Sequence, residues 1–233
     1  MKMWVKKLNI IDLFAGCGGL TTGFEMAGFN SVLAVEMDNG AAETYKFNHP
    51  NTKVLIEDIT KIDKISEYIE KEKLDEGIDG IIGGPSCQSY SLAGKRDPND
   101  PRSSLFMDYL RLVREINPKF FVMENVQGLL SAKTKSGEKV IDLVLSEMDK
   151  SGYNVNYELL NAAEFGVPQS RKRLIFIGIR KDLEFRKDEV LPKGYKKVVL
   201  EFSNDPYPIF FNRSRIIFSN ATGDNFITSE SNS

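Results

Sequence analysis

Residues 10–20, Ile-Ile-Asp-Leu-Phe-Ala-Gly-Cys-Gly-Gly-Leu, are the stretch that decides the fold of this chain. The apolar run from Ile10 to Phe14 predicts a buried strand, and the glycines after it predict a tight turn. The turn opens a short helix that we expect over Leu20–Ala27. A strand, a glycine turn and a helix in this order are typical of the first unit of an α/β sheet.

Outward from this stretch, strands and helices are predicted to alternate along the chain. We expect further strands at 31–35, 53–56, 78–82, 119–123, 155–160 and 174–179, and further helices at 40–47, 62–71, 105–116 and 140–148. Such alternation, with nearly continuous apolar strands, indicates a doubly wound, mostly parallel sheet covered on both faces. Ligands of these sheets bind beyond the carboxyl ends of the strands.

Length and composition set the broad class of the protein. The chain has 233 residues, 41% of them hydrophobic and 27% charged, which suits one substantial α/β domain. It contains no apolar run of membrane-spanning length, and its first residues lack the apolar core of a signal peptide, so we expect a cytoplasmic protein. The net charge of −2 gives the chain as a whole no basic footprint for nucleic acid.

The two cysteines and the single histidine restrict the chemistry. Cys17 and Cys87 are 70 residues apart and neither belongs to a metal-spaced pair, so we expect neither a metal site nor a disulfide. With His49 as the only histidine, a Cys–His catalytic pair is difficult to build. We interpret His49, in Asn-His-Pro, as a residue at a helix end.

Three successive strand ends carry groups that suit a nucleoside. Gly16 and Gly18 would let the backbone approach a ligand closely, and Glu36, 20 residues after Gly16, could accept hydrogen bonds from both ribose hydroxyls. Asp58, after the third strand, could accept from an exocyclic amine. Thr21 stands where a dinucleotide fingerprint would have glycine. The pattern therefore favours an adenosine-type ligand over a pyrophosphate and makes an NAD oxidoreductase a distant alternative.

Cys87 lies in Gly-Gly-Pro-Ser-Cys-Gln, residues 83–88, directly after an apolar strand. The turn formers before it and the polar run after it argue against a core position. The loop that follows, residues 93–101, is long, polar and rich in turn formers, which is typical of a functional lid. We therefore interpret Cys87 as a nucleophile, which requires a lowered pKa of its thiol.

Two further polar clusters accompany strands. Glu124-Asn125-Val126 follows the apolar run 120–123, and Pro-Gln-Ser-Arg-Lys-Arg, residues 168–173, opens the strand expected at 174–179. A nucleophile, an acid and two arginines at strand ends suit attack on an electron-poor ring that its neighbours hold and protonate.

In this order, Asp-Leu-Phe-Ala-Gly-x-Gly-Gly, Gly-Gly-Pro-x-Cys-Gln, Glu-Asn-Val and Gln-x-Arg-x-Arg resemble the catalytic domain of DNA cytosine-5 methyltransferases, from about Asn9 to Arg180. The resemblance implies S-adenosyl-L-methionine as cofactor and a cytosine flipped out of duplex DNA as substrate, as in restriction-modification systems. It also implies the Rossmann-like methyltransferase fold, with a reversed strand near one edge of the sheet.

The resemblance also implies a role for each matching residue. Cys87 would add to C6 of the cytosine, Glu124 would hold and protonate N3, and Arg173 would contact O2 with Arg171 in support. The residues expected to bind the cofactor are Phe14, Gly16, Gly18, Gly19, Leu20, Glu36, Met37, Asp58, Ile59, Pro85 and Leu105. Those expected to face the DNA are Gln88, Ser91 and Gln169.

The chain departs from the family pattern at two places. Ser86 precedes the nucleophile where the family has proline, so we expect a less rigid thiol and reduced activity. After residue 180 the family continues into a target recognition domain, whereas here 53 residues remain and end in a polar tail from Ser219, which we expect to be disordered. We therefore expect a catalytic domain over 1–180 and a truncated extension over 181–233.

These departures leave several hypotheses open. The recognition domain could be carried by a second polypeptide. The chain could instead be a cofactor-binding fragment that is inactive without a partner. It could also be a cytosine-5 methyltransferase that acts on RNA.

Overall fold

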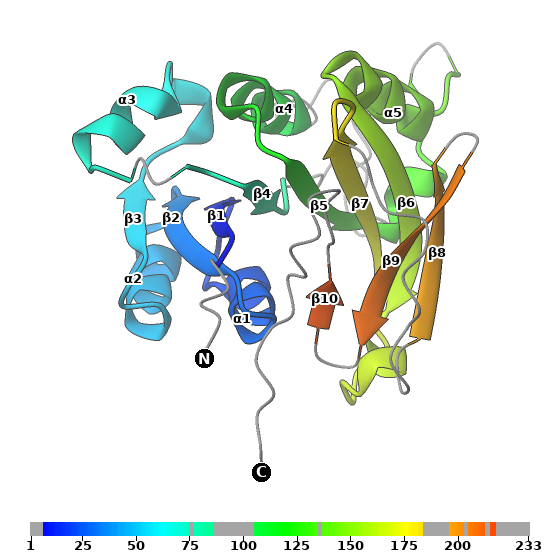
Figure 1. The fold of residues 1–233 in the computed structure, drawn as a ribbon, viewed down its shortest axis with the longest axis horizontal. Coiled ribbons are helices and arrows are strands. Elements are labelled where there is room, and N and C mark those ends of the chain that lie inside the picture. The colour runs from blue at the N-terminus through cyan, green and yellow to red at the C-terminus, as the bar shows by residue number, and fades with distance from the viewer. Residues whose placement is uncertain are drawn as a thin grey trace, which may run out of the picture.

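The computed structural model in Figure 1 describes residues 7–74, 77–85, 105–134 and 137–183, together with the backbone of three strands between 196 and 217. Seven strands form one sheet in the order β3-β2-β1-β4-β5-β7-β6. Their bounds are β1 Asn9–Leu13, β2 Asn30–Glu36, β3 Lys53–Ile56, β4 Gly80–Gly83, β5 Phe120–Val126, β6 Tyr153–Asn161 and β7 Lys172–Arg180.

The sheet confirms the doubly wound, mostly parallel architecture. The chain builds β1, β2 and β3 outward in one direction and then returns to place β4 beside β1, so the strand order reverses between β1 and β4. Ligands of doubly wound sheets bind at such a reversal. Strand β7 pairs antiparallel with both β5 and β6, and it is the reversed strand near one edge that the resemblance implied.

Helices cover both faces of the sheet (Figure 1). Helices α1 (Gly19–Met26) and α2 (Asn39–Asn48) lie on one face. Helices α3 (Ile65–Lys71), α4 (Leu105–Ile116) and α5 (Val140–Lys150) lie on the other. Short 3₁₀ turns follow β3, β5 and β6, and they are η1 (Ile59–Lys61), η4 (Gln127–Leu130) and η5 (Ala162–Phe165).

Alternate strand residues supply the two apolar cores. Ile11 and Leu13 pack on the side of α3, α4 and α5, whereas Ile10 packs with Phe24 of α1. Tyr109 of α4 is fully buried, and its hydroxyl lies 3.2 and 3.0 Å from the carbonyl oxygens of Ile81 and Val122. This contact fixes α4 over the junction of β4 and β5.

Several expected element boundaries differ from the structure, and three of the differences have a clear local reason. Phe14 has φ 58°, so β1 ends at Leu13 and the chain already turns at Phe14. The helix expected at 62–71 begins at Ile65, because Ile62 and Lys64, between the 3₁₀ turn η1 and the helix, have an extended backbone. The strand expected at 119–123 continues to Val126, because β7 pairs with it along its whole length.

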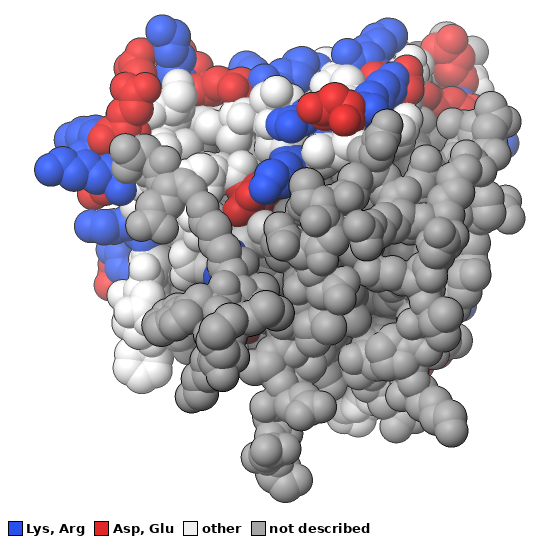
Figure 2. Space-filling model, viewed as in Figure 1, with Lys and Arg blue, Asp and Glu red and all other residues white. Residues whose placement is uncertain are grey.

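After β7 the chain forms a second, three-stranded antiparallel sheet of β8 (Lys196–Phe202), β9 (Asp205–Asn212) and β10 (Arg215–Ile217). The polar tail expected to be disordered lies outside the described residues. Where the chain is described, none of its helices is long and apolar enough to cross a membrane. On the face in Figure 2, basic and acidic side chains interleave along the edge formed by α3, α4 and α5.

Candidate active site

The glycine turn after β1 is tied to the end of β2 by Glu36. The Gly16 amide donates to Oε2 of Glu36 at 2.8 Å, and the Asp38 amide donates to Oε1 at 2.8 Å. A carboxylate oxygen can accept more than one hydrogen bond, so both oxygens keep capacity for ligand hydroxyls. The structure therefore brings two of the predicted cofactor residues, Gly16 and Glu36, into direct contact at the carboxyl edge of the sheet.

The same turn uses backbone conformations that side chains disfavour. Gly16 and Gly18 have φ 55° and 89°, and Gly18 is the N-cap of α1. The Gly18 amide donates to the Ala15 carbonyl at 2.9 Å, which closes the turn tightly. Phe14, half-buried, has a positive φ without being glycine, and such strain is concentrated at ligand-binding segments.

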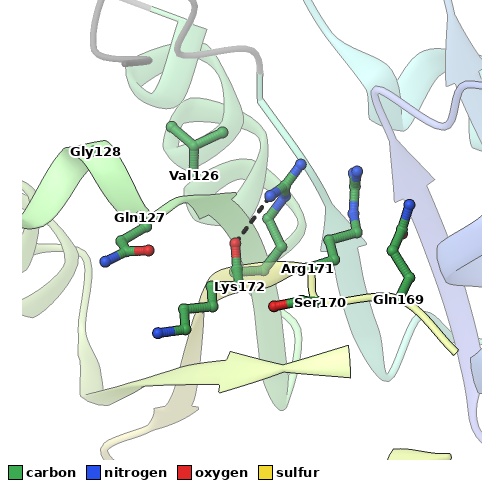
Figure 3. A pocket seen from close by; sticks show the side chains of 8 residues that line it. Val126, Gln127, Gly128, Gln169, Ser170, Arg171 and Lys172 are labelled. Carbon is green, nitrogen blue, oxygen red and sulfur yellow. Dashed lines mark hydrogen bonds between the residues drawn. The ribbon is translucent and has the colours of Figure 1, made fainter. Parts of the chain in front are cut away.

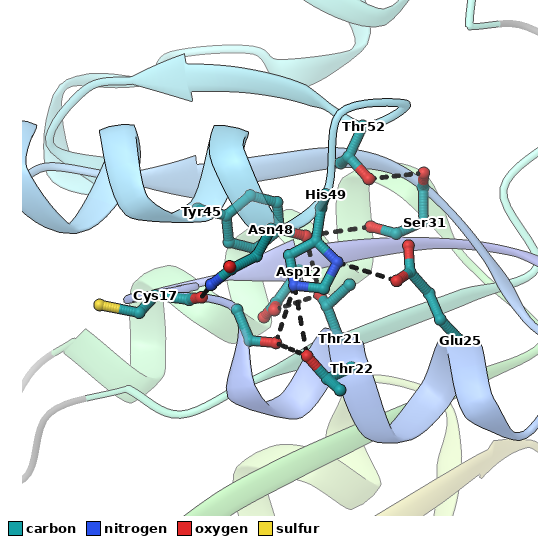
Figure 4. Close-up of polar contacts among 11 residues, drawn as sticks. Asp12, Cys17, Thr21, Thr22, Glu25, Ser31, Tyr45, Asn48, His49 and Thr52 are labelled. Atoms are coloured by element: carbon teal, nitrogen blue, oxygen red, sulfur yellow. Dashed lines mark hydrogen bonds and ion pairs between the residues drawn. The ribbon is translucent and has the colours of Figure 1, made fainter.

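A buried polar chain lies beneath the turn (Figure 4). Thr21 of α1 donates to Oδ2 of Asp12 at 2.6 Å, and the Thr21 hydroxyl lies 2.8 Å from the hydroxyl of Tyr45. Since Thr21 uses its hydrogen on Asp12, it accepts from Tyr45, and Tyr45 in turn accepts from Ser31 at 3.2 Å. Burial raises the pKa of Tyr45 to about 12, which keeps the phenol protonated as a donor.

Asp12 is the carboxylic acid of this network, and no role of its own was predicted for it from the sequence. Burial raises the pKa of Asp12 to about 7, against the opposing hydrogen bond from Thr21, and the nearby Glu36 carboxylate adds to the rise. Its Oδ1 is buried without a hydrogen-bond partner among the described residues. An acidic residue inside an otherwise apolar strand was the signal in the sequence that could have identified it.

The residues expected around an adenine lie at the ends of β2, β3 and β4. Asp58 accepts at Oδ1 from both the amide and the hydroxyl of Thr60, which lowers the pKa of its carboxyl group. Met37 is 67% exposed at the end of β2, whereas Ile59 is buried. Pro85 is buried beyond β4, and Leu105, half-buried, begins α4.

A second cluster lies where β5 and β7 meet. Because β7 runs antiparallel to β5, its first residues lie at the carboxyl end of β5, and Val126 pairs with Arg173. Glu124 pairs with Ile175, so Glu124 and Arg173 are diagonal neighbours on one face of the sheet. Nε of Arg173 lies 2.6 Å from Oε1 of Glu124 in an ion pair whose side chains are 27% and 29% exposed.

The turn that leads to the predicted nucleophile passes beside this ion pair. A Cβ atom built on Gly84 would lie 3.4 Å from Oε2 of Glu124. The chain three residues before Cys87 is therefore in van der Waals reach of the Glu124 carboxylate. Cys87, Gln88 and Ser91 themselves lie outside the described residues, as does Ser86.

A polar hollow of about 590 Å³ adjoins the ion pair (Figure 3). It is lined by Val126, Gln127, Gly128, Gln169, Ser170, Arg171, Lys172 and Arg173. The structure thus brings Gln169, Arg171 and Arg173 together around one hollow, and it adds Lys172 and Gln127, for which no role was predicted from the sequence. The Arg171 amide donates to Oδ1 of Asn161 at 3.0 Å, which holds the segment against the end of β6.

Known proteins resemble this chain over most of its length. The family described as C-5 cytosine-specific DNA methylase matches residues 8–217. The Type II methyltransferase M.DdeI of Desulfomicrobium norvegicum is 52% identical over 185 residues, which cover 79% of this chain and 44% of that protein. M.AquIA of Picosynechococcus sp. is 44% identical over 179 residues, which cover 74% of this chain and 72% of that protein.

The fold matches solved structures as well. A DNA modification methyltransferase encoded within an E. coli prophage superposes with a TM-score of 0.65 at 30% identity, covering 85% of this chain and 62% of that one. The DNMT2 of Spodoptera frugiperda gives a TM-score of 0.59 at 28% identity, covering 80% and 56%. The chain spans about half the length of the first curated relatives that it matches.

Proposed function

Because this chain belongs to the C-5 cytosine-specific DNA methylase family, we propose that it transfers a methyl group from S-adenosyl-L-methionine to C5 of cytosine in duplex DNA. The observation that carries the proposal is the Glu124–Arg173 ion pair, which lies beside the Gly84 turn that leads to Cys87. The Glu124 carboxylate, the Arg173 guanidinium and the turn that leads to Cys87 thus lie together at the carboxyl edge of the sheet.

Residues at and beyond the ends of β2 and β3 fit this cofactor. Glu36 offers two carboxylate oxygens to the ribose hydroxyls, and Asp58 offers a carboxylate to the adenine amine. The exposed Met37 would offer an apolar contact to the adenine ring, as would Ile59, which follows Asp58 in the chain. Bound there, the cofactor supplies a methyl group on a positively charged sulfur.

The chain's own residues then carry the chemistry on the base. The Cys87 thiolate attacks C6 and forms a C–S bond, while Glu124 delivers a proton to N3, so that the ring gains no net charge and C5 becomes nucleophilic. Arg173 donates to O2 and neutralises charge that develops on the ring. After C5 has taken the methyl group, water removes the C5 proton, the C–S bond breaks and the thiolate leaves, and N3 returns its proton to Glu124.

The ion pair explains how the Glu124 side chain is held in position before a cytosine enters the hollow. Oε1 of Glu124 accepts from Arg173, and the guanidinium keeps the carboxylate oriented beside the hollow. When a cytosine enters, Arg173 donates to O2 of the base in place of Glu124, and the released Glu124 carboxylate takes up a proton from water, which it then delivers to N3. The pair is thereby exchanged for contacts with the substrate, which requires the base to leave the DNA stack at a cost of a few kcal/mol.

We propose further that reading of the target sequence depends on protein outside the catalytic domain of residues 1–180, in a second polypeptide that carries a recognition domain. The similarity to M.DdeI covers only 44% of that protein, so much of that relative has no counterpart here. M.AquIA is a shorter relative, since the similarity covers 72% of it.

The decisive experiment traps the covalent adduct. Duplex DNA that contains 5-fluorocytosine is incubated with cofactor and the full chain, with and without the product of the adjacent gene. The fluorine at C5 cannot leave as a cation, so an active chain stays bound to the DNA through Cys87 and migrates as one species on a denaturing gel. Single-stranded RNA of the same sequence tests the alternative substrate.

The two cysteines allow a matched control. Cys87→Ser removes the proposed nucleophile and should abolish the adduct, whereas Cys17→Ser removes the exposed second thiol and should leave an adduct. Cofactor binding without any adduct, even with the partner present, would instead support a cofactor-binding protein without catalysis.

A further inference from the structure

The single histidine of the chain packs against the glycine turn. His49, the C-cap residue of α2, has a side chain that is only 2% exposed. Its Nε2 lies 3.1 Å from the carbonyl oxygen of Gly18, and its Nδ1 lies 2.8 Å from Oε2 of Glu25 on α1 (Figure 4). The imidazole therefore connects the end of α2 to both the turn and the helix that follows it.

The partners of the ring determine which atom donates. The Gly18 carbonyl and the Glu25 carboxylate both accept hydrogen bonds, so the ring nitrogen that faces each of them is the donor, and Nε2 carries the hydrogen that it donates to Gly18. Glu25 holds the opposite side of the ring, as carboxylates do when they orient a functional histidine. The Tyr45 ring, with its centroid 4.6 Å from that of the imidazole, limits rotation from a third direction.

Gly18 is matched to this histidine. A Cβ atom at position 18 would collide with Nε2 and Cδ2 of His49, so the close approach requires glycine. The Gly18 carbonyl also accepts from the amide and the hydroxyl of Thr22, each at 2.9 Å. His49 is thus a third donor to the carbonyl oxygen of Gly18, the N-cap residue of α1.

Asn48 makes a parallel contact with the preceding peptide. Its Nδ2 donates to the carbonyl oxygen of Cys17 at 3.3 Å. Two consecutive side chains at the end of α2 therefore hold two consecutive carbonyls of the turn. The Gly16 amide, on the other side of the turn, is held by Glu36.

We propose that His49 is a positioning residue for the cofactor: it holds the Gly18 peptide, so that the turn at residues 16–19 is already shaped before the cofactor binds. This inference rests on the proposed function for its ligand. His49 is buried behind the turn, so it acts through the peptide that it holds. Loss of the contact raises the cost of ordering the turn, which weakens cofactor affinity and leaves the chemical step unaltered at saturating cofactor.

The first experiment uses nuclear magnetic resonance on the untagged full chain without cofactor. It measures which ring nitrogen of His49 carries a hydrogen and how fast the Thr22 amide exchanges. Because the chain has one histidine, its ring ¹⁵N signals are assigned without ambiguity. We expect Nε2 to carry a hydrogen, and the amide of Thr22, which donates to the same carbonyl, to exchange faster in His49→Phe than in the wild type. A ring protonated only at Nδ1, or unchanged exchange in His49→Phe, would overturn the proposal.

The second experiment measures binding of S-adenosylmethionine by titration calorimetry. His49→Phe keeps a ring but loses the donor, and we expect it to bind about three- to tenfold more weakly, which is the net contribution of one hydrogen bond. His49→Gln keeps a donor and should recover most of this loss. A purely space-filling histidine would give the opposite order, with phenylalanine the better replacement.

Two carboxylate variants complete the design and guard against a misfolded His49→Phe. Glu25→Gln leaves the ring in place but loosens it, and should weaken binding about two- to threefold. Glu43→Gln is the matched control on α2, because Glu43 pairs with Lys46 on the surface, and its affinity should equal that of the wild type. Equal cofactor affinity in all four variants would refute the proposal. A wild-type chain that binds no cofactor would instead contradict the proposed function, and the exchange measurement would then decide the role of His49.

Discussion

The turn at residues 16–19 and the hollow around Arg173 lie at the same edge of one sheet, yet the two regions hold their polar groups by different means. Around the turn, Thr21 and Tyr45 form a buried chain of hydrogen bonds, and Glu36 accepts from two backbone amides. At the hollow, three consecutive basic side chains face solvent and one carboxylate, Glu124, pairs with one of them.

This difference follows from what each region would bind. A small cofactor is enclosed by the protein, so the groups that hold it benefit from being fixed in advance by buried hydrogen bonds. A DNA strand is large, charged and hydrated, so the surface that meets it uses exposed cations whose interaction with phosphates is strong at low salt. Substitutions in the two regions should therefore differ in kind as well as in size.

The largest effect is expected at the ion pair. Glu124→Gln keeps the shape of the side chain but cannot deliver a proton to N3, and we expect methyl transfer to fall about 10²- to 10⁴-fold. Cofactor affinity should not change, because Glu124 belongs to the other region. Single-turnover transfer of a labelled methyl group to duplex DNA measures the rate, and calorimetry measures the cofactor affinity.

A neighbouring carboxylate provides the control for this prediction. Glu158 of β6 pairs with Ile175 from the opposite side to Glu124 and is exposed. Glu158→Gln removes the same charge from the same row of the sheet, and its rate should stay within about twofold of the wild type. Equal losses in both variants would assign the effect to net charge rather than to the proton that Glu124 carries.

The second prediction concerns the turn and compares two glycines with positive φ. Gly18→Ala places a methyl group against His49 in a left-handed conformation, and we expect the free energy of unfolding to fall by about 3 kcal/mol. Gly16→Ala meets no atom within 4 Å, so only the backbone cost of about 1 kcal/mol applies. Urea denaturation of the two variants would contradict the account of Gly18 if their losses were equal.

The same comparison explains how much could be predicted from the sequence. The strand, turn and helix of residues 10–20 follow from apolar runs and glycines, and the reversed β7 followed from the family resemblance. The pairing of Glu124 with Arg173 could not be predicted from spacing, because it depends on the antiparallel register that makes them diagonal neighbours. The motifs that contain Glu124 and Arg173 suggested only that both residues belong to one site.

Buried polar partners were the features that sequence reasoning missed. His49 was correctly placed at a helix end, but its contacts with Gly18 and Glu25 join residues 24 or more positions apart and depend on how α2 packs on α1. Asp12 was read as part of the glycine motif, and its unusual pKa arises from complete burial, which only the assembled sheet provides.

The third prediction uses that burial. The pKa of Asp12 is raised from 3.8 to about 7, so between these values the folded chain holds a proton that the unfolded chain has lost. Stability contributed by the neutral carboxyl is therefore complete below pH 3.8 and declines as pH rises toward 7. Between pH 5 and pH 7 the wild type should lose roughly 2 kcal/mol of unfolding free energy relative to Asp12→Asn, which does not titrate.

Urea denaturation of both proteins at several pH values measures this difference, and only its change with pH is interpreted. The absolute stability of Asp12→Asn also contains the cost of a buried amide beside Thr21. A difference that stays constant from pH 5 to pH 7 would show that Asp12 is ionised throughout this range.

The smallest effect is expected for Lys172, an exposed residue of the hollow. If the hollow faces the DNA backbone, Lys172→Met should weaken DNA binding about threefold near 0.1 M salt, equally for all sequences, and should lower the slope of log affinity against log salt by about one. Lys46→Met removes an exposed lysine from α2 and should leave the slope unchanged. Since the cofactor turn depends on buried hydrogen bonds, cofactor affinity should stay insensitive to salt in both variants. An unaltered slope in Lys172→Met would place the DNA backbone elsewhere and restrict the basic hollow to the base itself.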